Sequence, residues 1–185
     1  MIRKIAFGAV ILGSVTMLGL TGCSKSEKQE TAAPGRDTSA MVTDIPAADS
    51  PIITELKARL EARPNDPDTL QRLGDAYFDA KRFNEAVTYY KKALEFKPGD
   101  ADIFNDLGLS LHYLGNPAGG LTYIEEGIKK NPYHQRIWLT KGFILAYGMG
   151  DLDAARSAWE KANALNPESQ VGKAASEFLA QINKK

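Results

Sequence analysis

From residue 51 onward, apolar residues recur at spacings of three and four, the pattern of amphipathic helices. The pattern itself repeats along the chain. A Leu-Gly pair at 73–74 returns 34 residues later at 107–108, and a glycine returns again at Gly142, where Lys141 replaces the leucine. One extra residue enters at 148–151, so the later positions return after 35 residues. The sequence therefore predicts three consecutive copies of one unit.

Each unit is predicted to form two antiparallel helices joined by a short turn. Asn116 followed by Pro117 is typical of a helix start, with the asparagine as N-cap and the proline at the first helical position. Asp151 is a second expected N-cap. The second helix of each pair is expected to stop before a proline, at Pro98, Pro132 and Pro167. We expect the three helix pairs to occupy residues 67–100, 101–134 and 135–169.

Small residues at matching positions are expected to let the paired helices approach closely. The predicted contacts are Gly74 with Ala86, Gly108 with Gly120, and Gly142 with Ala155. Glycine in a helix interior costs up to about 1 kcal/mol relative to alanine. Because Gly120 and Gly127 stand where other copies have alanine, we expect the second helix of the second pair to be the least stable.

Two further helices flank the repeats. The segment at 51–66 carries Ile53, Leu56 and Leu60 at helical spacing and predicts an N-terminal flanking helix. The segment at 170–185 has one apolar stripe with polar residues elsewhere, which predicts a C-terminal capping helix. Its stripe consists of Val171, Ala175, Phe178, Leu179 and Ile182.

The repeated motif resembles the tetratricopeptide repeat (TPR), whose pattern is Trp-x2-Leu-Gly-x2-Tyr, then Ala-x3-Phe, then Pro. The resemblance covers residues 67–167, and its first copy contains Leu70, Leu73, Gly74, Tyr77, Ala86, Tyr90 and Pro98. It implies an all-α fold, a right-handed α-solenoid of three TPR helix pairs between the flanking and capping helices.

The amino-terminal segment predicts export and lipidation. Arg3 and Lys4 precede an apolar run at 5–20, which is shorter than the roughly 20 residues of a membrane-spanning helix and is typical of a signal peptide. The sequence Leu20-Thr21-Gly22-Cys23 resembles the lipobox of bacterial lipoproteins. The resemblance implies a signal peptide at 1–22, acylation of Cys23 and, because Ser24 follows, the periplasmic face of the outer membrane. The alternative is an ordinary signal peptide with a chance cysteine.

Residues 23–50 are predicted to be a flexible tether, because they are polar and contain few large apolar side chains. The alternative is an extra strand or helix near Met41. The chain has 23 basic and 23 acidic residues, so removal of 1–22 with Arg3 and Lys4 leaves a net charge of −2. This balance predicts no nucleic-acid partner.

No catalytic residues are predicted. The two histidines, His112 and His134, have no metal-ligand spacing with carboxylates or a thiol, and no nucleophile or phosphate-binding motif occurs. The tryptophans and tyrosines recur at repeat spacing, which favours core packing. We therefore expect no enzyme activity, no metal, no cofactor and no small-molecule substrate.

The expected functional surface is a groove lined by the first helix of each pair, where a peptide or helix of a protein partner binds. Its predicted residues are Gln71, Asp75, Phe78, Asn105, Leu109, His112, Tyr113, Leu139 and Phe143. The alternative for Leu139 and Phe143 is burial under the capping helix or under the stem of Lys141.

These features predict a membrane-anchored adaptor that holds protein partners during assembly of the cell envelope. One alternative is a regulatory subunit that positions an envelope enzyme, such as a peptidoglycan hydrolase. Another is a cytochrome c maturation factor, whose repeat domain resembles the stretch at 55–67. A structural spacer is a further class, which would lack an apolar binding groove.

Overall fold

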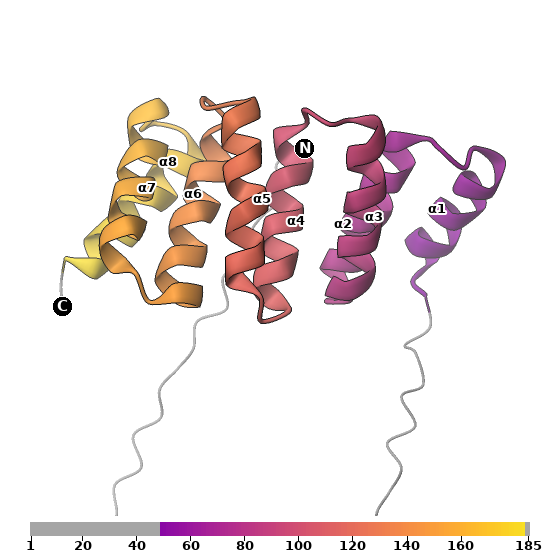
Figure 1. Ribbon diagram of the computed structural model, residues 1–185, viewed down its shortest axis with the longest axis horizontal. Helices are drawn as coiled ribbons and strands as arrows, with labels where there is room; N and C mark the ends of the chain where they lie inside the picture. Colours follow the sequence, from indigo (N-terminus) through magenta and orange to yellow (C-terminus); the bar gives the residue numbers. More distant parts are fainter. Residues whose placement is uncertain (1–48, 184–185) are drawn as a thin grey trace, which may run out of the picture. The chain divides into compact units, whose positions relative to one another are not determined.

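A computed structural model describes residues 49–183, and this part of the chain is entirely helical (Figure 1). It contains eight α-helices and one π-helical turn. They are α1 (Pro51–Ala62), α2 (Pro67–Asp79), α3 (Phe83–Phe96), α4 (Ala101–Tyr113), α5 (Pro117–Lys130), α6 (Gln135–Ile144), η1 (Leu145–Met149), α7 (Leu152–Leu165) and α8 (Gln170–Ile182). The predicted signal peptide, Cys23 and the segment near Met41 lie outside the described residues. None of the described helices is long and apolar enough to cross a bilayer.

The helices form pairs that stack in the order of the sequence (Figure 1). The pairs are α2 with α3, α4 with α5, and α6 with α7, while α1 contacts α2 and α8 covers α7 and α6. This arrangement confirms the predicted all-α solenoid with its N-terminal flanking helix and C-terminal capping helix. Each unit buries its apolar side against its neighbours, as expected of a repeat array.

Side-chain caps explain where several helices begin. The Asn116 side chain accepts a hydrogen bond from the Gly119 backbone N–H at 2.9 Å, and Asp151 accepts one from Ala154 at 2.9 Å. Both predicted N-caps are therefore confirmed. The same role is played by Asp66, Asp100 and Ser169. These caps satisfy backbone donors that have no partner within the helix.

The close contacts between paired helices differ in part from those expected. Gly108 and Gly120 face each other as predicted, because a Cβ added at Gly120 would lie 2.5 Å from the Gly108 carbonyl oxygen. At Gly74, in contrast, an added Cβ would lie 2.6 Å from the Tyr90 ring, and at Gly142 the nearest side chain is Trp159. The first and third pairs thus use glycine to seat a buried aromatic ring, where we expected contact with an alanine.

The extra residue in the third unit is accommodated within the helix. The α6 helix continues into the π-helical turn η1, and the chain then reverses at Gly150, which has a φ of 71°. The Asp151 N–H closes this end by donating to the Leu145 carbonyl at 3.0 Å. A π-helical segment is rare and occurs mostly as a single turn within an α-helix, as it does here.

Candidate protein-binding site

One repeat position on the first helices is buried in the second and third repeats. Gln71, Asn105 and Leu139 lie 34 residues apart and occupy the same position in α2, α4 and α6. Asn105 is 1% exposed and Leu139 is 3% exposed. The prediction that Asn105 and Leu139 are exposed in a groove is therefore wrong. For Leu139 the covering element is α8, whose Ala175 belongs to the same buried cluster.

Leu139 belongs to the core between the last repeat and the cap. It clusters with Trp159 and Ala175, and Trp159 Nε1 donates to its carbonyl oxygen at 3.1 Å. The alternative that the capping helix buries Leu139 is the one the structure supports. Phe143 is half-buried, and its ring centroid lies 6.4 Å from that of Phe178 on α8.

Four of the other predicted residues, Asp75, Leu109, Tyr113 and Phe143, lie along one side of α2, α4 and α6. We call this side the first-helix face and define it by residues at equivalent repeat positions. Its members are Asp75, Asp79, Asp102, Asp106, Leu109, Tyr113, Arg136, Phe143 and Tyr147. Sequence reasoning did not select Asp102, Arg136 or Tyr147 as site residues. Counting 34 residues from Asp68 and from Tyr113 would have found them.

One part of the first-helix face is polar and acidic. Arg136 at the start of α6 donates through Nη2 to Asp102 at 2.9 Å and to Asp106 at 3.1 Å. His134 Nε2 lies 3.2 Å from the same Asp102 carboxylate. The hydrogen bond with His134 and the charge of Arg136 hold the pKa of Asp102 below its usual value. On α2, Asp75 accepts a hydrogen bond from the Tyr90 hydroxyl at 2.8 Å.

This polar part contains buried atoms with unused hydrogen-bonding capacity. Asn105 donates through Nδ2 to Asp106 at 3.0 Å, but its Oδ1 has no partner among the described residues. The same holds for His134 Nδ1 and Arg136 Nε. Unpartnered buried polar atoms usually cost stability. The three around this one ion-pair cluster therefore call for an explanation other than stability.

The aromatic residues of the face belong to a larger set of rings that also includes residues of α3, α7 and α8. Eight rings form a continuous series, in which neighbouring centroids lie 4.8 to 6.4 Å apart. We call it the aromatic row. Its members are Phe78, Phe83, His112, Tyr113, Phe143, Tyr147, Trp159 and Phe178. The row connects all three repeats to the cap, and such edge and stacked contacts stabilise the units against one another.

His112 lies in the middle of the aromatic row. Its ring is 5.4 Å from Tyr113 and 5.3 Å from Phe143, and Nδ1 has no partner among the described residues. Burial lowers the pKa of His112 below its ordinary value, so the ring is neutral at pH 7. His112 therefore acts as one more aromatic side chain in the row.

The two exposed tyrosines provide the accessible part of the row. Tyr113 is 44% exposed and Tyr147 is 57% exposed, whereas Trp159 is fully buried beneath Phe178. Exposed rings on a rigid helical scaffold are suited to contact apolar side chains of another protein. Within residues 49–183, no group of three or more His, Cys, Asp or Glu residues is arranged to hold a metal ion.

Comparisons with known proteins agree with this fold. Residues 74–115 match a family described as TPR repeat. Protein FlbA of Caulobacter vibrioides is 29% identical over 101 residues, which is 55% of this chain but only 17% of that relative. The sequence match and the helix pairs together support a tetratricopeptide-repeat protein.

Solved structures show the same architecture. MamA is similar with a TM-score of 0.59 at 21% identity, covering 71% of this chain and 85% of MamA. A thermophilic TPR protein of Thermus thermophilus gives 0.62 at 20% identity, covering 71% and 73%. The first TPR of Spaghetti bound to an HSP90 peptide gives 0.57 at 18% identity, covering 64% and 90%. These likenesses define the fold.

Proposed function

We propose that this protein is a non-enzymatic adaptor that binds a peptide or helix of a protein partner on the first-helix face. The observation that carries this proposal is the aromatic row, which crosses all repeats and exposes Tyr113 and Tyr147 at its rim. Aromatic residues on a rigid surface are typical anchors of protein interfaces. The TPR of Spaghetti, which shares the fold, was solved with a peptide bound.

The polar part of the face gives the site a direction. Asp102 and Asp106 lie toward the start of α4, whereas Tyr113 is the last residue of α4 and Tyr147 lies in η1, where α6 ends. A bound segment would therefore meet carboxylates at one end and aromatic rings at the other. Electrostatic complementarity of this kind favours orientation and selectivity more than affinity.

The test is partner capture in intact cells by a photoreactive amino acid placed at Leu109. Changing both Tyr113→Ala and Tyr147→Ala is expected to lower recovery of the crosslinked partner about tenfold or more, because each aromatic anchor contributes about 2 kcal/mol. Tyr133→Ala is the matched control, since Tyr133 is 77% exposed and lies outside the face. Asn105 is unsuitable for this test because it is buried.

Helicity measured by circular dichroism must be unchanged in both variants. Equal recovery from the double variant and the control, with the fold intact, would place the partner on another surface.

The membrane anchor is a separate part of the proposal. We infer from the lipobox-like sequence that Cys23 is acylated and holds the protein at the periplasmic face of the outer membrane. Several acyl chains together anchor a protein stably, whereas one does so only marginally. Metabolic labelling with a fatty acid should mark the wild type and leave Cys23→Ser unlabelled. Label on the serine variant would rule out Cys23 as the acylated residue.

A further inference from the structure

The large apolar side chains exposed on the described helices are concentrated at one end of the molecule. Eight such residues are at least 38% exposed. Five of them lie where first helices end or second helices begin, and a sixth, Ile52, lies at the start of α1. We call this surface the turn edge. Its six residues are Ile52, Tyr113, Leu114, Tyr147, Met149 and Leu152. Only Phe96 and Tyr133 lie at the opposite ends of the helices.

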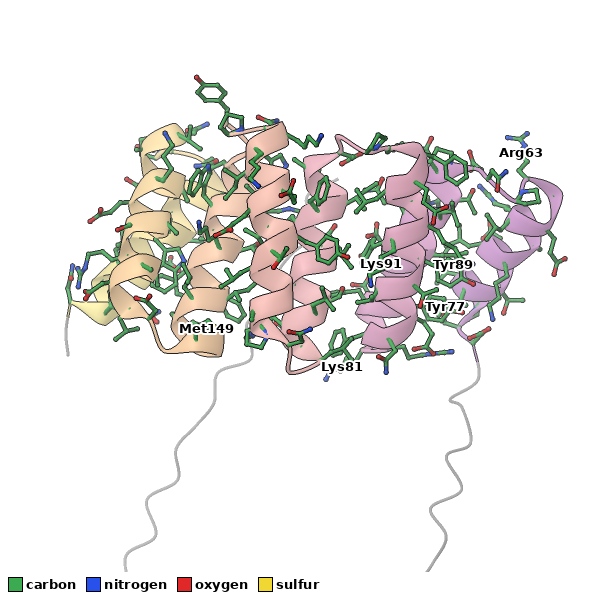
Figure 2. The ribbon with its side chains drawn as sticks, in the orientation of Figure 1. Arg63, Tyr77, Lys81, Tyr89, Lys91 and Met149 are labelled. Carbon is green, nitrogen blue, oxygen red and sulfur yellow. The ribbon has the colours of Figure 1, made fainter. Side chains whose placement is uncertain are left out.

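The turns of the second and third repeats meet at this edge. A Cβ added at Gly148 would lie 2.6 Å from Pro117 and 2.8 Å from His112, so η1 sits directly against the start of α5. This contact places η1, which carries Met149, against the start of α5, which follows the turn that carries Leu114. Figure 2 shows Met149 and Lys81 at the same lower end of the helices, with Arg63 at the other end.

The described chain also begins at the turn edge. Helix α1 runs antiparallel to α2, so its first residue lies beside the α2–α3 turn. Asp49 fixes this position through ion pairs with Arg82 of that turn at 2.6 Å and with Lys57 of α1 at 2.5 Å. Everything that precedes Asp49, including Cys23, therefore joins the domain at its apolar end.

We infer that the turn edge rests on the surface of the lipid bilayer. The inference rests on the proposed acyl anchor, because the 25 residues at 24–48 can span at most about 90 Å even when fully extended. A tether attached at the apolar end keeps that end within this distance of the membrane. The anchor also raises the local concentration of lipid, so weak contacts suffice.

The side chains of the turn edge fit an interfacial role. Tyr113 and Tyr147, which the turn edge shares with the first-helix face, each combine an apolar ring with a polar hydroxyl, the chemistry found at the headgroup level of membranes, so they border the bilayer and remain beside the partner site. Leu114, Met149 and Leu152 supply apolar groups for the region below.

The exposed charges beside the edge select the kind of lipid. They include the acidic residues Asp79, Asp151 and Asp153. Lys81, in the turn between α2 and α3, is an exposed basic residue. Acidic side chains do not favour an anionic surface. The edge therefore matches zwitterionic lipid such as phosphatidylethanolamine.

The experiment uses the full chain with Cys23→Ser, so that an introduced cysteine is the only thiol. A histidine tag at the amino terminus holds it on phosphatidylethanolamine and phosphatidylcholine vesicles that carry a nickel-chelating lipid. An environment-sensitive fluorophore is attached at Met149→Cys or, as the matched control, at Tyr133→Cys. We expect lipid-borne quenchers to quench the label at 149 and to leave the label at 133 unaffected.

Second variants test the chemistry of the contact. Leu114→Ser with Leu152→Ser should weaken membrane contact of the label at 149 about tenfold or more, because each change removes a large apolar group from the interface. Phe96→Ser, at the opposite end, should have no effect. Added phosphatidylglycerol should not strengthen the contact.

Three results would overturn the inference. They are equal quenching at 149 and 133, an unchanged signal in the double serine variant, and shielding of position 149 without vesicles, which would indicate a protein partner at the edge. Because the tag replaces the acyl chains, this outcome is independent of whether Cys23→Ser loses its fatty acid in cells.

Discussion

Asn105 buries an amide at a repeat position that is apolar one unit later, where Leu139 stands. Its Oδ1 has no partner among the described residues, and an unsatisfied buried acceptor costs about 1 to 3 kcal/mol. Asp106 would keep its bonds from Arg136 if the amide were removed. The amide therefore lowers stability at a site where leucine has a similar branched shape.

We predict that Asn105→Leu raises the free energy of unfolding by about 1 kcal/mol, measured by urea denaturation. Asn105→Asp is the paired control and should lower stability, since it places a second carboxylate beside Asp106 in a buried site. A loss of stability in the leucine variant would show that the amide oxygen has a partner in solution.

At the residue scale, only part of the candidate site could be predicted from the sequence. The 34-residue period correctly identified the first helices, and Asp75, Leu109, Tyr113 and Phe143 lie along one side of them. The period alone does not tell which side of a helix the next unit covers. That depends on how α4 approaches α6, and this is why the buried position of Asn105 was assigned to the exposed face.

At the scale of elements, the backbone contact between α4 and α5 is set by two glycines. A Cβ at Gly120 would meet the Gly108 carbonyl oxygen at 2.5 Å, and backbone atoms cannot move aside as a flexible side chain can. A Cβ at Gly127 would meet Phe104 and Ile137. Glycine thus lowers the intrinsic helix propensity of α5 but permits its packing.

We predict that Gly120→Ala lowers the free energy of unfolding by about 1 to 3 kcal/mol, because overpacking outweighs the gain of up to about 1 kcal/mol in helix propensity. Gly99→Ala is the control and should be nearly neutral, since no atom lies within 4 Å of its added Cβ. Thermal melts of both variants make the comparison. A stabilised Gly120→Ala protein would mean that α4 and α5 separate readily.

Helix positions followed from the sequence because caps and prolines are local signals. Asn116 and Asp151 cap the helices they precede, as expected. The conformation around the inserted residue could not be predicted, because the same sequence is compatible with a longer loop and with a π-helical turn. The choice of η1 depends on its contacts with α5 and α7, which are tertiary.

At the scale of the whole molecule, α8 completes the hydrophobic core of the last repeat. Ala175 is fully buried, and the Phe178 ring stacks on Trp159 with centroids 4.8 Å apart. Leu179 and Ile182 contact the same cluster. Terminal repeats need such a cap because they have no further neighbour to cover them.

Deletion of residues 168–185 is therefore expected to lower the melting temperature by several degrees or to cause aggregation, as the loss of a helix from a domain of this size implies. Circular dichroism melts and light scattering provide the measurement. Glu177→Ala, an exposed change on the same helix, should leave the melting temperature unaltered. A truncated protein that melts like the full chain would show that α8 adds no stability.

The stacking order was predictable at this scale because repeats contact only their neighbours in sequence. The concentration of exposed apolar residues at one end was not. The contact of η1 with the start of α5, which brings the turns of the second and third repeats to the same edge, is tertiary and has no local sequence signal.

The ion pairs of Asp49 have a mechanical consequence. A load on the chain before residue 49 enters the domain where Asp49 contacts both Lys57 of α1 and Arg82 of the α2–α3 turn. These contacts link the flanking helix to the first repeat, so a pull at this point acts on both. An acidic residue at the start of the described fold thus connects α1 to the first repeat at the point where the preceding chain enters.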